Sequence, residues 1–237
     1  MGFHYLSSRW VPHCLDDLQK SNRVRICSEL LEELKKLTPT GRSYLITSDE
    51  SWFFHDNPHY AKWASHTKEA DTRPRRTISS AKTLVAVFWS FRGFYYAEVL
   101  PRGTKYNADF VITKILPGFE ASVSETRPVL KAARTKLHWD NARPHCASKT
   151  RTKLAEKHII LLPHPAYSPD VAPSDFFLFG YLKDRLQGAT FQCSDELLRA
   201  ITDLIASIPQ ETLDRVFDEW MHRLEVVVAS GGEYYRK

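Results

Sequence analysis

The stretch SYLITSDESWFF, residues 43–54, combines a run of apolar and β-branched residues with two adjacent acids, Asp49 and Glu50. This composition is typical of a buried strand, so we predict a strand from Ser43 to Phe54 that carries Asp49. A buried carboxylate that has no partner costs several kcal/mol or takes up a proton. Two interpretations of Asp49 are therefore open: a metal ligand, or a strand acid paired with a nearby Arg or Lys.

Two further acids follow on separate predicted elements. Asp140 ends a short strand predicted from Thr135, and Asp175 begins a helix predicted to run to Leu186 with Ser174 as its N-cap. Taken singly, Asp140 fits an Asx turn or a helix cap, and Asp175 fits an ordinary acid at a helix N-terminus. Taken together, three carboxylates on separate elements supply the oxygen ligands that hard divalent cations such as Mg²⁺ need in a two-metal nuclease.

The remaining elements predict an α/β domain with a mixed sheet and helices packed on it. After an extended arm, Asp16 and Asp17 cap a helix that runs to about Leu37. A helix from Asn107 to Leu116 is interrupted or ended by Pro117 and Gly118. The other predicted elements are a hairpin of Thr83–Phe91 and Phe94–Leu100 that turns at Arg92-Gly93, a helix 147–158, a strand 159–163, and helices 194–207 and 211–229.

Charge is unevenly distributed along the chain, although the net charge is only +5. Residues 127–157 contain nine Lys or Arg against two acids, a balance of +7, whereas residues 194–230 contain eight acids against three arginines. A phosphate backbone is attracted to the first region and repelled by the second. A solvated basic helix face is the alternative, but the basic region encloses Asp140.

Several function classes are disfavoured by composition. No apolar run of about 18 residues is present, so the sequence predicts no transmembrane helix. The four cysteines are scattered without a C-x-x-C pair, which predicts free thiols and neither a disulfide framework nor a zinc site. We expect no membrane partner and no small-molecule cofactor.

The motifs resemble those of the mariner branch of DNA transposases. The resemblance rests on the Asp49-Glu50 strand, the runs Asp140–His145 and Tyr167–Asp175, and the linker-like Trp10–Leu15, and it covers nearly the whole chain. Asp175 as the third acid points to mariner, because Tc-type relatives usually carry Glu there. The resemblance implies a ribonuclease-H-like fold in which the first and fourth strands lie side by side and a later helix delivers the third acid.

This resemblance also implies the chemistry. Asp49, Asp140 and Asp175 become catalytic residues and ligands of two divalent cations, Mg²⁺ or Mn²⁺, for DNA strand cleavage and then transfer to a TA target. Asn141 and His145 would support these ligands, although a hydrogen bond from His145 to a backbone carbonyl is the competing interpretation. Glu50 would point to the opposite face of a regular strand.

The partners follow from the same family. Lys149, Lys153 and Lys157 recur at helical spacing, and we predict that they contact DNA phosphates without reading sequence. Further predicted DNA contacts are Arg143, Arg73, Arg75 and Arg76. An arm containing Trp10, Val11, Pro12 and His13, together with a clamp-type loop at 57–82, would pair two subunits as a homodimer, although Trp10 could instead fold back on its own domain.

We divide the chain into a linker arm and helix, residues 1–40, and a catalytic domain, residues 41–237. Mariner transposases normally begin with two helix-turn-helix modules, and nothing before Trp10 could supply them. The alternative function is therefore a truncated or domesticated module that binds DNA and dimerises without transposition. A DNA substrate predicts a nuclear location.

Overall fold

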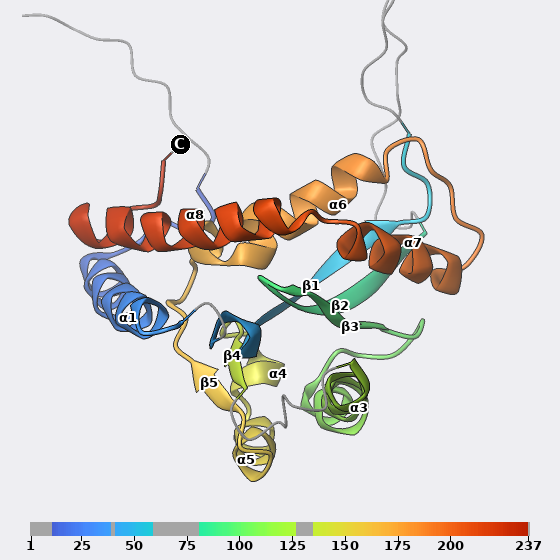
Figure 1. Ribbon diagram of the computed structural model, residues 1–237, viewed down its shortest axis with the longest axis horizontal. Helices are drawn as coiled ribbons and strands as arrows, with labels where there is room; N and C mark the ends of the chain where they lie inside the picture. The colour runs from blue at the N-terminus through green and yellow to red at the C-terminus, as the bar shows by residue number, and fades with distance from the viewer. Residues whose placement is uncertain (1–10, 39–40, 59–80, 127–134, 237) are drawn as a thin grey trace, which may run out of the picture.

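A five-stranded mixed sheet forms the centre of the computed structural model, which describes residues 11–38, 41–58, 81–126 and 135–236 (Figure 1). The strands are β1 (Leu45–Phe54), β2 (Lys82–Ser90), β3 (Gly93–Val99), β4 (Lys136–His138) and β5 (Ile160–Leu162), in the spatial order β3-β2-β1-β4-β5. The pairs β1–β2 and β2–β3 are antiparallel, whereas β1–β4 and β4–β5 are parallel. The predicted adjacency of the first and fourth strands is therefore confirmed.

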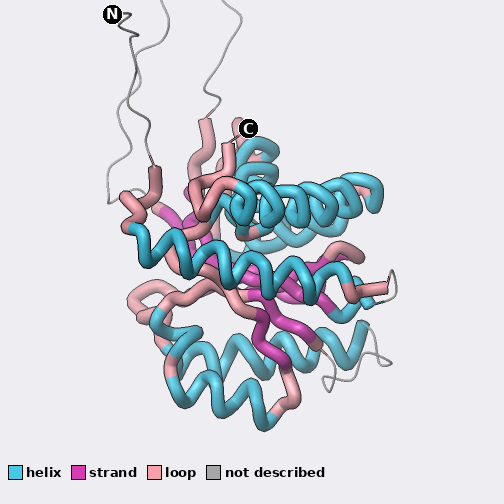
Figure 2. Tube along the Cα trace, turned by 90° about the vertical axis from the view of Figure 1, so that its left-hand side faces the viewer, coloured by secondary structure: helices cyan, strands magenta, loops and turns pink. Residues whose placement is uncertain are grey.

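Helices cover both faces of this sheet, as Figures 1 and 2 show. One layer contains α1 (Asp17–Lys35), α6 (Phe179–Arg185), α7 (Ser194–Ala206) and α8 (Gln210–Ala229). The other contains α2 (Ala108–Phe110), a π-helical turn at Val111–Ile115, α3 (Leu116–Thr126), α4 (Arg143–Cys146) and α5 (Ser148–Glu156).

Strand β2 shows why two layers are needed, because its alternating side chains are apolar on both faces. Val87 and Trp89 belong to the core under α1, α6, α7 and α8. Ala86 and Phe88 belong to the core under α3 and α5. Burial of both faces places the sheet in the middle of the domain.

The helix after the arm begins where the sequence predicts. Asp16 accepts a hydrogen bond from the backbone N–H of Gln19, and the Gln19 side chain accepts one from the N–H of Asp16, a reciprocal capping box. Cys27 and Leu30 on the inner face of α1 join the same core as the sheet. In the hairpin, Gly93 has a φ of +122°, which glycine adopts without steric cost.

Two local predictions were wrong. The chain does not leave the helix at Pro117, because Pro117 lies in the first turn of α3, directly after the π-helical turn, where a missing N–H is tolerated. Gly118 allows close packing on β3, since a Cβ there would overlap the Tyr96 ring. Ser174 is not an N-cap: the helix already includes it, in a π-helical turn Ser174–Leu178, and its hydroxyl accepts a hydrogen bond from Trp89 Nε1 at 3.1 Å.

None of the helices in the described ranges is both long enough and apolar enough to cross a membrane. All four cysteines are free thiols.

Candidate active site

Parallel pairing of β1 with β4 brings the first two acids together. Thr47 is in register with His138, and Asp49 and Asp140 each follow two residues later. Side chains two residues apart share a face of a strand, and the Thr47 hydroxyl does lie 3.3 Å from His138 Nδ1. Asp140 therefore follows the carboxyl end of β4, a position where open α/β sheets place their sites, and lies beside Asp49 in the middle of the longer strand β1.

Asp175 reaches the same place from the helical layer. It lies in the π-helical turn at Ser174–Leu178, which is anchored to β2 by the contact between Ser174 and Trp89. Asp140 and Asp175 both line a hollow of about 410 Å³, and residues 164–169 form much of its wall. The structure thus brings three sequence-distant acids together beside the carboxyl end of β4.

The charges of these acids act on one another. Burial raises the pKa of Asp49, and the nearby charges of Asp175, Glu50 and Asp140 raise it further. Burial and the charge of Asp140 also raise the pKa of Asp175, while the Lys183 ammonium lowers it. Two carboxylates that resist ionisation together need a cation to be fully charged.

Divalent metal ions fit this donor chemistry. Within the described ranges, no three His, Cys, Asp or Glu side chains are already arranged to hold a metal ion. The three acids nevertheless offer only oxygen ligands, the donors that Mg²⁺ prefers, and their pKa shifts mark uncompensated negative charge. A divalent cation would reverse that cost by favouring the ionised carboxylates.

His145 connects Asp140 to Glu50. Its Nδ1 lies 2.6 Å from Asp140 Oδ1 and its Nε2 lies 3.2 Å from Glu50 Oε1, so the predicted alternative, a hydrogen bond to a backbone carbonyl, was wrong. Burial disfavours the imidazolium, but the two carboxylates outweigh this and raise the pKa of His145 to about 9. Burial would also raise the pKa of Asp140, yet His145 and the Ala142 N–H hold it below its usual value.

Glu50 and Tyr106 are site residues that sequence reasoning missed. Glu50 does project from the face opposite Asp49, but it reaches His145 and accepts a hydrogen bond from the Tyr106 hydroxyl. The His145 ring also stacks on Trp139, with centroids 3.7 Å apart. The adjacency of Glu50 to Asp49 was the only available signal, since Tyr106 lies far away in the sequence.

Asn141 supports a loop, and among the described residues it forms no hydrogen bond to Asp49, Asp140 or Asp175. Its Nδ2 donates to the His164 carbonyl at 2.6 Å, which ties the end of β4 to the chain after β5. Below it, His138 Nε2 and His164 Nδ1 are 3.0 Å apart, and burial lowers the pKa of both rings. A buried, neutral histidine pair thus underlies Asp140.

The predicted lysine stripe is not a free cationic face. Lys149 pairs with Asp109, Lys153 with Glu156 at 3.0 Å, and Lys157 with Glu120 at 2.8 Å. By contrast, Arg143 and Arg151 have no ion-pair partner within the described ranges. The predicted contacts Arg73, Arg75 and Arg76 lie outside the described residues.

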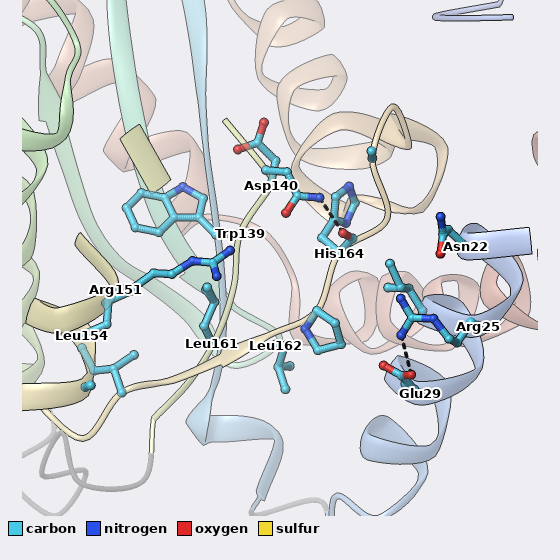
Figure 3. A pocket seen from close by; sticks show the side chains of 16 residues that line it. Asn22, Arg25, Glu29, Trp139, Asp140, Arg151, Leu154, Leu161, Leu162 and His164 are labelled. Atoms are coloured by element: carbon cyan, nitrogen blue, oxygen red, sulfur yellow. Dashed lines mark hydrogen bonds and ion pairs between the residues drawn. The ribbon is translucent and has the colours of Figure 1, made fainter. Parts of the chain in front are cut away.

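Arg151 lines a groove of about 920 Å³ that runs between α1, α5 and β5. In Figure 3, Arg151 and Trp139 lie on one side of the groove, Asn22 and Arg25 of α1 lie on the other, and Asp140 stands at its end. Helical spacing identified the lysines of α5 but does not show which cations are already paired, so Arg151 was not among the predicted contacts.

The arm packs against its own chain where it is described. The His13 ring stacks on Tyr167, with centroids 4.2 Å apart, near the loop that leads to Asp175. Val11 and Pro12 directly precede it, and Trp10 lies outside the described residues.

A mixed sheet that carries acids on two adjacent parallel strands, one within β1 and one just after β4, with a third acid on a later helix, defines a ribonuclease-H-like domain of the DDE transposase class. Residues 54–130 match the family model described as Transposase (partial DDE domain). The chain is 30% identical over 238 residues to the mariner Mos1 transposase of Drosophila mauritiana, covering 99% of this chain and 68% of that protein. This chain belongs to the mariner transposase family.

Other relatives agree. The human histone-lysine N-methyltransferase SETMAR is 29% identical over 235 residues, which cover 96% of this chain but only 33% of SETMAR. A Mos1 paired-end complex with Mn has a TM-score of 0.85 and 30% identity, covering 100% of this chain and 69% of that one. The Mos1 catalytic domain has a TM-score of 0.76 and 28% identity, covering 96% of this chain and 100% of that one.

Proposed function

We propose that this domain cleaves DNA strands and transfers them to a target by divalent-metal-dependent phosphoryl transfer. The observation that carries the proposal is the gathering of Asp49, Asp140 and Asp175 beside the carboxyl end of β4, with pKa shifts that mark unneutralised charge. Solved structures of the related Mos1 transposase include paired-end complexes with Mn and with Mg and a strand transfer complex, which support the same chemistry here.

The metal ions would be held by Asp49, Asp140 and Asp175. Two divalent cations, when bound there, would supply charge that favours ionisation of the attacking hydroxyl and stabilises the departing oxygen. The chain's own residues prepare the ligands for this role. His145 Nδ1 contacts Asp140, which fixes the orientation of that carboxylate and keeps it ionised. Glu50 and Tyr106 contact the other ring nitrogen, Nε2, and so orient the imidazole.

The proposed partners are DNA and a second copy of the chain. The proposed phosphate contacts are Arg143, Lys149, Lys153, Lys157, Arg73, Arg75 and Arg76. We propose a nuclear location because the substrate would be DNA. The arm Trp10–His13 and the loop 57–82 are proposed to pair two subunits. The Mos1 paired-end complexes support DNA as a partner and a dimeric assembly.

Sedimentation velocity tests the assembly. We expect a dimer in the presence of transposon-end DNA. A monomer both with and without that DNA would contradict it.

A plasmid-nicking assay tests the activity. With Mg²⁺ or Mn²⁺, the parent should convert supercoiled plasmid to the nicked form, and Asp175→Ala should not, because it removes one of the three carboxylates. Asp195→Ala, which removes an exposed acid in the first turn of α7, is the matched control and should nick like the parent. Absence of metal-dependent nicking by the parent, or equal nicking by the parent and Asp175→Ala, would reject the enzyme and favour a DNA-binding module.

A further inference from the structure

Lys183 is a cation beside the acid cluster, and it has no role in the proposed reaction. It lies on α6, eight residues after Asp175, and its ammonium donates a hydrogen bond to Ser51 Oγ at 2.8 Å. Ser51 follows Asp49 by two residues on β1. Lys183 therefore bridges the strand that carries Asp49 and the helical segment that carries Asp175.

The groups that stabilise the charge of Lys183 are neutral. Its Nζ lies 5.6 Å from the centroid of the Phe53 ring and 5.8 Å from that of Phe179, distances at which aromatic faces attract a cation. It forms no ion pair in the described part of the chain, unlike Lys149, Lys153 and Lys157. Because an ammonium has three N–H donors, two remain after the bond to Ser51.

The ammonium is near enough to the acids to act on them and open enough to meet a ligand. Its hydrogen-bond partner Ser51 shares a face of β1 with Asp49, two residues away. Lys183 is an exposed residue, and it lines a hollow of about 310 Å³ together with Asn57, Gln187 and one acid, Asp184. An anionic chain that reaches Asp175 would pass this amine before or after the reacting group.

We propose that Lys183 binds the DNA phosphate that adjoins the reacting phosphodiester, on the Asp175 side of the site. This inference rests on the proposed function, since it assigns one substrate contact within that reaction. The competing role is structural, with Lys183 serving only to tie α6 to β1 through Ser51. Removing the Ser51 hydroxyl breaks that tie and leaves the cation, so the two roles can be separated.

The test is binding of a fluorescein-labelled nicked DNA duplex, followed by fluorescence anisotropy over a series of salt concentrations, with Ca²⁺ in place of Mg²⁺. Lys183→Met should weaken binding roughly tenfold, the effect of losing one charged hydrogen bond. It should also reduce the slope of log Kd against log salt by about 0.7–0.9, the contribution of one phosphate contact. Lys183→Arg should keep most of the slope, because it keeps the charge.

Two variants serve as controls. Arg185→Met removes an exposed cation from the same helix, one whose guanidinium stacks on Tyr181 at 3.5 Å, and should bind like the parent. Ser51→Ala should also bind like the parent. The proposal is overturned if Lys183→Met keeps the parent's affinity and slope, if Ser51→Ala reproduces its loss, or if the parent does not bind the duplex. Failure of the proposed function shows separately, as absence of nicking in Mg²⁺ by a parent that still binds DNA.

Discussion

At the scale of single residues, the environment of Asp49 couples stability to pH. Its folded-state pKa is raised to about 8 from an ordinary value of 3.8, first by burial and then by the neighbouring acids. A raised carboxyl pKa means that the folded protein holds its proton more tightly than the unfolded chain. The metal-free protein should therefore lose stability as the pH rises between these two values.

Asp49→Asn tests this coupling. Above a pH of about 8, the neutral amide should raise the Tm of the metal-free protein, by about 2–4 °C for each kcal/mol of ionisation cost removed. The same change should abolish stabilisation by Mg²⁺. Differential scanning calorimetry across the pH range measures both effects, with the exposed Asp195→Asn as control. An unchanged Tm for Asp49→Asn would show that Asp49 ionises without cost.

His145 is the second residue whose role can be isolated. Because its imidazole holds Asp140 and is itself held by Glu50, His145→Ala should free the Asp140 carboxylate to rotate. Loss of a partner behind a metal ligand typically lowers metal affinity by 10–100-fold, on the order of 1.4–2.7 kcal/mol. Titrating Mg²⁺ in the nicking assay should show this as a higher half-saturating concentration.

The control for His145 is His158→Asn, an exposed histidine with a φ of +55°, a conformation that Asn tolerates. If His145→Ala and the control respond to Mg²⁺ equally, His145 does not support a ligand.

At the scale of elements, α5 and the segment before it carry two kinds of cation: some are paired with acids, and others have no ion pair among the described residues. Lys149 and Lys157 are matched by acids on the neighbouring segments around α2 and α3, whereas Arg143 and Arg151 have no such partners among the described residues. Cations that must first leave a carboxylate gain less from a phosphate.

DNA binding should follow this division. We expect the Arg143→Met, Arg151→Met double variant to reduce the salt slope of DNA binding by up to about 1.8, two phosphate contacts at roughly 0.9 each. The Lys149→Ala, Lys153→Ala, Lys157→Ala triple variant should reduce the affinity and the slope less, and uniformly across DNA sequences. Filter binding at several salt concentrations compares them. If the triple variant keeps the parent's affinity and slope, the stripe does not contact phosphates.

At the scale of the whole molecule, one buried ion pair joins three distant segments. Arg23 of α1 donates to both Asp170 carboxylate oxygens, at 3.1 and 2.8 Å, and its Nε donates to the Gly232 carbonyl at 2.9 Å. The Tyr235 N–H also donates to Asp170, so the C-terminal end closes the network. The loop before Asp175 is thereby fastened to α1 and to the chain after α8.

Arg23→Met should destabilise the fold by about 3–5 kcal/mol, because it leaves the largely buried Asp170 carboxylate without its partner. Arg25→Met, two residues away on the same helix, breaks only an exposed pair with Glu29 and should cost about 0.3–0.5 kcal/mol. Urea unfolding followed by circular dichroism measures both free energies. Equal, small losses would mean that the Arg23–Asp170 pair does not stabilise the fold.

Much of the secondary structure could be predicted because its signals are local. The helix start at Asp16, the continuous apolar run of β2 and the turn at Arg92-Gly93 each depend on residues a few positions apart. The errors at Pro117 and Ser174 arose where a π-helical turn shifts the hydrogen-bonding register, since neither residue carries a sequence signal for such a turn.

By itself the sequence determined the order of strands and helices, the positions of the three acids and, through its motifs, the family. Only the tertiary structure decided which charges are neutralised, because pairs such as Lys157–Glu120 and Glu50–His145 join residues far apart in the chain. It also decided the position of Lys183, which forms no ion pair among the described residues, since its bond to Ser51 exists only once α6 packs against β1. Electrostatic energies depend on distance in space, and spacing along the chain does not report that distance.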